Sequence, residues 1–433
     1  MPIDMQSQPE VKQLTGVRIF EAEQIKLDNG ISVHVINLGE REMNRIEVIA
    51  EGGKCDENAK MNGGLAVSLF KEGSKFHDGK EIANTIDYYG SWLSSNITHH
   101  DTSSIMYSLN NNLNEVLPLF SDSIFNPTFP ENELENRKKL AINNLSTNAK
   151  RVSYVANVEF LKNYYGAESR IGKQTTAEDI KAITRDDLID FHNTWYHPEN
   201  MQIIVAGKIT QGILNALNQE FGQVPCFGEK RESLSDNSTI EFQPQTIVKH
   251  TPNALQSAII IGQPTKITRE HPDYIPLGIL ITAIGGYFGS RLMANIREDK
   301  GYTYGISSYL SGLRNDSYML TMCQCDNKYI PNVIEEFKKE INIIKNELIP
   351  EDELGRVKSF LISDLAKTLD TPFSIADYYS SQISSRIPHE YFNNQSRITE
   401  EISAATLRDM ANKYLDVDKM LTVIAGDETQ IKL

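Results

Sequence analysis

Arg297 and Tyr304 are the residues of this sequence whose types and spacing most clearly suit the binding of a carbonyl oxygen. They lie seven positions apart in GGYFGSRLMANIREDKGYTYG, the segment at 285–305. A guanidinium and a phenol both donate hydrogen bonds, and each can reach a carbonyl oxygen. Residue types alone leave a second interpretation open, in which Arg297 is a solvated charge at a helix end and Tyr304 is a packed strand residue.

The same segment predicts the elements that would position these two donors. Gly285 and Gly286 predict a turn, and the composition of 290–298 favours a helix. Gly301 is placed to end that helix in the left-handed conformation, and a β-prone run follows at 302–309. The donors would then lie at a helix end and at a strand start, so that one tight turn brings them together.

An internal duplication organises the whole chain. The pentapeptide PENEL at 130–134 recurs as PEDEL at 350–354, an offset close to 220 residues, and a long helical pattern follows each copy. The block at 176–208 has a counterpart at 399–427, and both contain two helical segments, a turn and an apolar strand that includes Ala-Gly. The two halves are therefore predicted to be two copies of one α/β unit.

This repeat predicts the domain organisation and the fold class. We expect an N-terminal domain over 1–228, a polar linker over 229–245 and a C-terminal domain over 246–433. Because strand-like runs alternate with long helices in each half, we expect an α+β fold. Each domain would have a mixed, mainly antiparallel sheet with helices on one face, and a cavity would lie between the two domains.

Composition limits the classes of partner. The formal charge of −15 argues against nucleic acid or an anionic membrane as the main partner, since both need a basic surface. The first 14 residues show no signal peptide, and no apolar run approaches the roughly 20 residues of a membrane span. We therefore expect a soluble, cytoplasmic protein.

The four cysteines do not predict a disulfide framework or a metal site. Cys55 and Cys226 are isolated, and we expect all four thiols to be reduced. Cys323 and Cys325 lie in the alternating run SYMLTMCQCD, which would point both side chains to one face of a strand. A structural role is the favoured interpretation of this pair.

Three ordered segments make the chain resemble the pitrilysin/insulinase family, whose members are similar to mitochondrial processing peptidases. They are LDNG at 27–30 followed by two strand-like runs, FHNTWYHPENMQIIVAGK at 191–208, and the segment at 285–305. Together, in order and within a duplicated chain, these segments are specific. The resemblance covers nearly the whole chain and implies two pitrilysin-like domains.

Active members of this family carry His-x-x-Glu-His on a helix, where two His bind Zn²⁺ and the Glu acts as base on the metal-bound water. The corresponding stretch here, residues 64–74, contains no His, and it is about one helical turn short. Val67 occupies the position expected for the first His. The region of the distant zinc ligand, 136–158, contains no carboxylate. The resemblance therefore implies a zinc-free chain.

No other histidines have the spacing of a replacement site. The nine His include no pair at helical spacing with a Glu between them. His99 and His100 are expected in a strand with side chains on opposite faces, and His192 and His197 are expected in packing or surface roles. A further candidate is an acid-base pair made of Glu72 and His77, for which a structural role is favoured. The nine histidines of the chain are His34, His77, His99, His100, His192, His197, His250, His271 and His389.

The resemblance assigns possible roles to two other elements. In the family, an Arg and a Tyr seven residues apart hold the peptide beside the zinc and stabilise the developing oxyanion, which makes Arg297 and Tyr304 the candidate catalytic residues. The run at 90–105 matches a strand on whose edge the family pairs peptide substrate. Ordinary sheet membership remains open for that run. The candidate substrate-binding residues are Ser94, Ser95, Asn96, Ile97 and Thr98.

The function implied by the resemblance is that of an inactive subunit of a zinc peptidase. The chain would supply Arg297 and Tyr304 to a partner that bears His-x-x-Glu-His and the zinc, and it would hold no cofactor of its own. The expected substrates are peptides or unfolded segments, and a homodimer is also possible. Two alternatives stay open: a non-enzymatic scaffold or peptide-binding subunit, and a self-sufficient metallopeptidase with a degenerate site.

Overall fold

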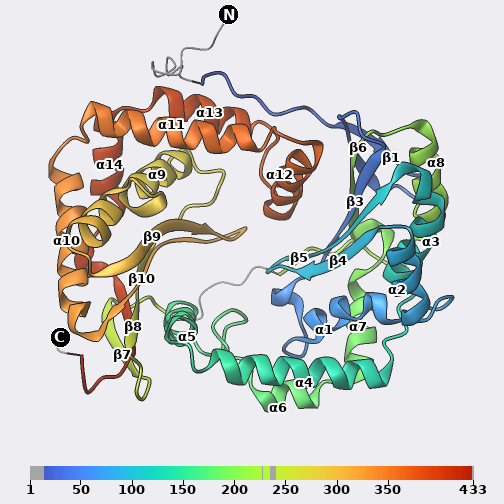
Figure 1. Ribbon diagram of the computed structural model, residues 1–433, viewed down its shortest axis with the longest axis horizontal. Coiled ribbons are helices and arrows are strands. Elements are labelled where there is room, and N and C mark those ends of the chain that lie inside the picture. The colour runs from blue at the N-terminus through green and yellow to red at the C-terminus, as the bar shows by residue number, and fades with distance from the viewer. Residues whose placement is uncertain (1–13, 227, 235–239, 432–433) are drawn as a thin grey trace, which may run out of the picture.

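The computed structural model describes residues 14–226, 228–234 and 240–431, which form two β-sheets covered by helices (Figure 1). The residues at 1–13, on which the prediction of no signal peptide mainly rests, lie outside the described part. Residues 235–239 of the predicted linker also lie outside it. None of the helices in the described ranges is both long enough and apolar enough to cross a membrane.

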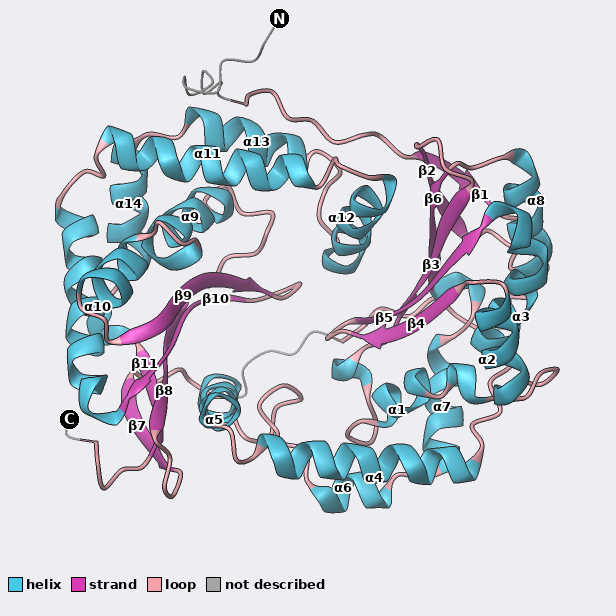
Figure 2. Cartoon of the chain, in the orientation of Figure 1, coloured by secondary structure: helices cyan, strands magenta, loops and turns pink. Residues whose placement is uncertain are grey.

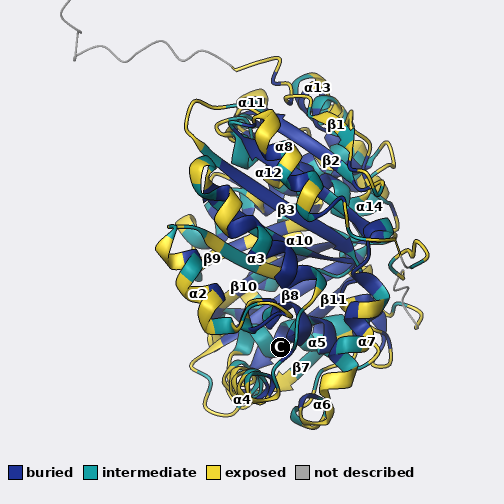
Figure 3. Cartoon of the chain, turned by 90° about the vertical axis from the view of Figure 1, so that its right-hand side faces the viewer, coloured by how far each residue is buried: buried dark blue, intermediate teal, exposed yellow. Residues whose placement is uncertain are grey.

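The first sheet has six strands, all from the N-terminal half. Their spatial order is β1-β2-β6-β3-β5-β4, and every neighbouring pair is antiparallel except β2 with β6. The long central strand β3 is buried along almost its whole length, as Figure 3 shows, because both faces of the sheet are covered. The strands are β1 (Glu23–Lys26), β2 (Ser32–Asn37), β3 (Met43–Glu51), β4 (Trp92–Ile97), β5 (Asp101–Leu109) and β6 (Met201–Gly207).

The second sheet repeats this topology in the C-terminal half. Its order, β7-β11-β8-β10-β9, matches β2-β6-β3-β5-β4, and again only the first of these pairs is parallel. The predicted duplication and the mixed, mainly antiparallel sheets are thereby confirmed. The strands are β7 (Gln245–His250), β8 (Gln256–Pro264), β9 (Thr303–Gly312), β10 (Ser317–Asp326) and β11 (Leu421–Gly426).

Helices of each half pack on one face of the sheet of that half (Figure 2). Several begin at a Thr whose hydroxyl accepts a backbone N–H, as Thr176, Thr184 and Thr210 do. The helices of the first half are α1 (Asn62–Ser68), α2 (Gly79–Tyr88), α3 (Leu113–Phe125), α4 (Glu131–Asn148), α5 (Val152–Tyr165), α6 (Ala177–Ala182), α7 (Arg185–Trp195) and α8 (Gln211–Glu220). Those of the second half are α9 (Tyr274–Ile281), α10 (Ile330–Asn346), α11 (Glu351–Lys367), α12 (Pro372–Ser385), α13 (Tyr391–Glu401) and α14 (Ala404–Tyr414).

One helix of each half packs against the sheet of the other half. Helix α5 packs on β8 and β11 of the second sheet, where Phe160 and Tyr164 join a buried apolar cluster with Ile260 and Val423. Helix α12 packs on β2, β3 and β6 of the first sheet. Because α5 and α12 hold equivalent places in the two copies, the exchange is reciprocal, and it covers the second face of each sheet.

Two local predictions were wrong. Gly285 and Gly286 do not form a turn but close a π-helical segment, Thr282–Gly286, that continues α9. A Cβ on Gly285 would lie 2.4 Å from Ser308 Oγ, so this glycine allows close helix-strand packing. His99 and His100 lie in the turn between β4 and β5, not in a strand.

Candidate functional site

Arg297 and Tyr304 lie on the two elements expected for them. Arg297 is near the end of the π-helical segment Met293–Asp299, and Tyr304 is the second residue of β9. Gly301 has φ of +66°, the predicted left-handed conformation. The Tyr302 N–H donates to the Ile296 carbonyl at 3.0 Å and closes the tight turn between the two elements.

Both donors line one open hollow of about 560 Å³ on the C-terminal half. Tyr304 is 91% exposed, so its hydroxyl can reach a bound group. The Arg297 guanidinium lies 4.8 Å from the ring centre of Phe288, which is itself 63% exposed, and it forms no ion pair with any described residue. A cation that is held by a ring rather than by a carboxylate keeps its charge available for a carbonyl oxygen or an oxyanion.

The wall of this hollow is a packed aromatic pair. Tyr302 stacks on Tyr329 with ring centres 4.7 Å apart, and Gln256 and Asp326 line the same hollow. Strand β9 begins here, on the outer side of the second half, and runs toward the middle of the molecule (Figure 2). The site is therefore presented outward by a rigid sheet edge.

Strand β4 is an edge strand, as the sequence predicted. It pairs with β5 alone, so the other edge is free of strand partners among the described residues. Ser95 and Asn96 are exposed, while Ser94 and Ile97 are half-buried. Thr98 lies beyond the strand, in the turn, where its N–H donates to the Asp101 carbonyl at 2.8 Å.

The donor set at the place of the family's zinc helix does not fit a metal. Helix α1 is only seven residues long and presents Gly64, Leu65 and Ser68 to the neighbouring hollow, and Val67 is buried in the core. Zinc needs imidazole, thiolate or carboxylate ligands in a tetrahedral arrangement. In the parts of the chain that the structure describes, no three His, Cys, Asp or Glu residues gather closely enough to hold a metal ion.

The side chain of Glu57, from the loop before α1, reaches the N-terminus of this short helix. Its carboxylate accepts the N–H groups of Met61 at 2.9 Å and Gly64 at 3.1 Å. Burial raises the pKa of Glu57, although both hydrogen bonds act in the opposite direction. The carboxylate thus stabilises the N-terminus of α1, which favours negative charge.

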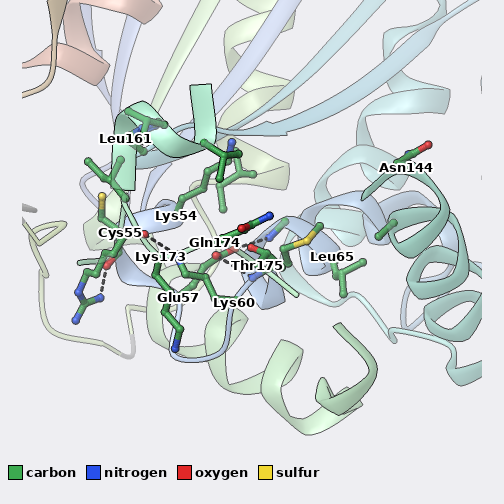
Figure 4. A pocket seen from close by; sticks show the side chains of 18 of the residues that line it. Lys54, Cys55, Glu57, Lys60, Leu65, Asn144, Leu161, Lys173, Gln174 and Thr175 are labelled. Atoms are coloured by element: carbon green, nitrogen blue, oxygen red, sulfur yellow. Dashed lines mark hydrogen bonds between the residues drawn. The ribbon is translucent and has the colours of Figure 1, made fainter. Parts of the chain in front are cut away.

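A pocket of about 700 Å³ remains where the metal site would be (Figure 4). It lies between α1, α4, α5 and the loop at 170–175. Figure 4 shows Lys54, Glu57, Lys60 and Lys173 grouped on one side, with Asn144 of α4 on the other. This pocket and the hollow at Arg297 share no lining residue. The predicted cavity between the two halves stays a prediction, because each of these hollows belongs to one half.

The candidate acid-base pair is not formed. Glu72 accepts a hydrogen bond from Arg137 at 2.5 Å, and His77 contacts Glu81 at 3.2 Å. The predicted structural roles of two other histidines are confirmed. His192 is buried with Nε2 2.7 Å from the Ile124 carbonyl oxygen, and His197 is buried beside a glutamate.

The structural role predicted for Cys323 and Cys325 is confirmed, since both are buried on one face of β10 in the core of the second half. No disulfide joins the four cysteines, all of which lie in the described ranges.

No sequence motif indicates the basic side chains of the pocket. Lys54, Lys60, Arg170 and Lys173 come from two loops more than 100 residues apart and belong to no motif. The position of Lys54 depends on its N–H, which donates to the Thr98 carbonyl at 3.0 Å. Only the folded chain brings these charges together.

Two family models match most of the chain. Residues 41–166 match the model of the insulinase family, peptidase family M16, and residues 182–361 match the model described as the peptidase M16 inactive domain. The chain belongs to the M16 family. The resemblance to pitrilysin and insulinase is thereby confirmed.

Relatives of this M16 chain include both a described protease and a described inactive homologue. YmxG of Bacillus subtilis (strain 168), described as an uncharacterized zinc protease, is 24% identical over 361 residues, which are 82% of this chain and 83% of YmxG. YmfF of the same organism, described as a probable inactive metalloprotease, is 18% identical over 229 residues, 52% of each chain.

Solved structures share the fold. The structure described as the peptidase M16 inactive domain from Pseudomonas fluorescens superposes with a TM-score of 0.84 at 22% identity, covering 95% of this M16 chain and 99% of that one. At this identity the likeness establishes the fold alone. Residues 182–361 of this M16 chain thus match the family's inactive-domain model, and the chain is related to proteins described as zinc proteases.

Proposed function

We propose that this chain is a zinc-free subunit that completes an M16 peptidase by presenting Arg297 and Tyr304 to a partner subunit bearing His-x-x-Glu-His. The partner would bind the zinc and activate water. This chain would hold the substrate carbonyl by two hydrogen bonds and stabilise the negative charge that develops on its oxygen. The substrates would be peptides or unfolded segments, which leave their carbonyl groups accessible.

One observation carries the proposal: the two donors line a single open hollow, while the stretch at 64–74 that corresponds to the family's zinc helix contains no His. The hollow and the pocket beside α1 share no lining residue, which supports a role for the donors at a site that another molecule supplies. The exposure of Tyr304 supports the same conclusion, because a side chain 91% exposed contributes little to packing. As the zinc ligands would come from elsewhere, this chain alone should neither retain zinc nor cleave peptides.

The test is reconstitution with an M16 partner that carries the zinc motif, followed with a quenched fluorescent peptide. Arg297→Ala and Tyr304→Phe should each lower kcat by roughly 100- to 1000-fold, the effect of removing one oxyanion donor. The zinc content of the complex and its assembly, followed by gel filtration, should not change. The purified chain alone should contain no stoichiometric zinc by mass spectrometry.

Matched controls separate donor loss from damage to the fold. Tyr309→Phe removes a hydroxyl from the same strand, where that hydroxyl contacts Met322 Sδ at 3.0 Å and not the hollow. Arg397→Ala removes an exposed helix charge far from the site in sequence. Both should leave kcat within about two-fold. If Arg297→Ala and Tyr304→Phe also leave kcat unchanged, the two residues have no part in catalysis, and the chain is a scaffold or peptide-binding subunit.

A further inference from the structure

Strand β9 contains a β-bulge directly beside Tyr304. Its regular pairing with β10 ends where Ile306 lies opposite Cys323, and the next paired residues are Thr303 and Cys325. Three steps along β9 therefore correspond to two steps along β10, so that β9 carries one extra residue at this point. A bulge of this kind bends the strand and changes the direction of a side chain, and it is common beside functional sites.

The bulge decides which face of the sheet Tyr304 points to. Ile306 and Ser308 are buried and Ser307 between them is exposed, as the alternation of side chains along a strand requires. If the regular register continued, Tyr304 would pair with Cys325 and point to the same buried face as Ile306. Tyr304 is instead 91% exposed, because the extra residue shifts the alternation by one position. The phenol therefore reaches the hollow only through this irregularity of the strand.

The hydroxyl of Thr303 joins the two strands across the bulge. Its Oγ1 donates to the Gln324 carbonyl on β10 at 2.6 Å and accepts the Gly305 N–H at 3.1 Å. The Gly305 carbonyl oxygen lies 2.9 Å from the same hydroxyl. Because a bulge interrupts the ladder, backbone groups beside it need other partners, and this one side chain supplies them on both strands. A methyl group in place of the hydroxyl could form none of these bonds.

We propose that Thr303 is a positioning residue of the site at Arg297 and Tyr304, and that its hydroxyl holds the bulge that directs the Tyr304 phenol into the hollow. The inference rests on the proposed function, because the direction of the phenol matters to catalysis only if Tyr304 acts on a substrate carbonyl. The two donors are then held by separate contacts, Arg297 by the Phe288 ring and Tyr304 by the bulge. Both are oriented before a carbonyl arrives, which is what makes such donors effective.

Thr303→Val tests the proposal in the reconstituted complex, since valine keeps the branched shape and suits a strand but lacks the hydroxyl. The kcat should fall by roughly 10- to 100-fold, the effect of a donor displaced by about 1 Å. KM should change by less than about two-fold, because the contact acts in the transition state. Thr303→Ser keeps the hydroxyl and should retain kcat within about three-fold. The matched control is Thr246→Val, the same change at an exposed position of β7 in the same sheet, which should leave kcat unchanged.

The double variant Thr303→Val/Tyr304→Phe separates positioning from a direct role. If Thr303 acts only through Tyr304, its hydroxyl has nothing left to position once the phenol hydroxyl is gone. The double variant should then have the kcat of Tyr304→Phe within about two-fold. Effects that multiply would show that Thr303 acts independently, on the substrate or on the fold, and would overturn the inference.

Hydrogen exchange on the isolated chain tests the bulge without a partner subunit. The Gly305 N–H donates to the Thr303 hydroxyl, so deuterium uptake by peptides that cover 302–306 reports on this bond. Exchange at this amide should become at least roughly 10-fold faster in Thr303→Val and stay unchanged in Thr303→Ser. Equal exchange in the wild type and in Thr303→Val would mean that the hydroxyl does not hold the bulge, and the inference would be wrong.

This inference and the proposed function can fail separately. If Tyr304→Phe lowers kcat and Thr303→Val does not, Thr303 has no positioning role, and the proposed function stands. If neither variant lowers kcat, the proposed function is wrong, and the positioning role of Thr303 is rejected with it.

Discussion

Arg314→Ala should loosen the junction between the two halves of the chain. Arg314 lies in the turn between β9 and β10, and its side chain is only 7% exposed. Its Nη1 donates to Glu51 Oε2 at 2.8 Å and its Nε to the Ser384 carbonyl at 2.7 Å, while Asp101 lies 3.6 Å from Nη2. The substitution removes one cation from between two largely buried carboxylates, both from the first sheet.

The expected cost is about 3 kcal/mol. Removing one partner of a buried ion pair costs roughly 3–5 kcal/mol, because the other charge stays buried. The lower end applies since Glu51 keeps Arg386, 3.1 Å away. For 433 residues the entropy of unfolding is about 0.9 kcal/mol per kelvin, so the melting temperature should fall by about 3 °C.

The decrease in the free energy of unfolding caused by Arg314→Ala should depend on pH. Burial alone would raise the pKa of Glu51, but hydrogen bonds and charge from Arg314, together with Arg386, lower it below the ordinary 4.5. A lowered carboxylate pKa stabilises the fold above about pH 4.5, and this stability is lost as pH falls through the folded pKa. Burial raises the pKa of Asp101, so its ionised form already costs stability at neutral pH, and that cost grows without Arg314. Both effects make the loss largest near pH 7 and smaller at pH 4.

Urea unfolding followed by circular dichroism at pH 7 and at pH 4 measures this difference. Arg386→Ala is the matched control, because it removes the same residue type from the same carboxylate at a site 40% exposed, and it should cost about 1 kcal/mol or less. If the loss from Arg314→Ala is equal at the two pH values, or no larger than that of the control, the interaction is not a buried charge contact and the reasoning fails.

Two further substitutions test the packing. Gly285→Ala should lower the free energy of unfolding by about 1–3 kcal/mol, since a Cβ would lie 2.4 Å from Ser308 Oγ. Gly278→Ala on α9 is the control, because a Cβ there meets nothing within 4 Å and should be neutral or stabilising. Thermal melts of both variants measure the difference, and equal effects would contradict the prediction. Phe160→Ala should lower the free energy of unfolding in urea by about 3–5 kcal/mol, because the ring is fully buried against the second sheet. A decrease below about 1 kcal/mol would show that α5 contributes little to that core.

The repeated fold could be predicted because the patterns that indicate it are local in sequence or recur in both halves. Apolar strand runs, helical patterns and the recurrence of PENEL as PEDEL can be recognised without contacts between distant residues. The exchange of α5 and α12 could not be predicted in this way. An amphipathic helix shows that one face is buried, but not which of two equivalent sheets buries it. Likewise, the glycine pair at 285–286 was predicted to form a turn. A Cβ on Gly285 would instead clash with Ser308, more than 20 residues away, and that contact cannot be recognised in the local sequence.

The same distinction between local and long-range contacts applies to the candidate site. Arg297 and Tyr304 are joined by one turn, so their shared hollow could be foreseen from seven residues of sequence. The basic pocket could not, because Lys54 and Lys173 meet only through tertiary structure. The placement of His99 in a strand failed for a related reason. The turn is stabilised by Thr98 and Asp101, whose side chains bond to each other at 3.0 Å, and that contact cannot be recognised from the alternation of the run alone.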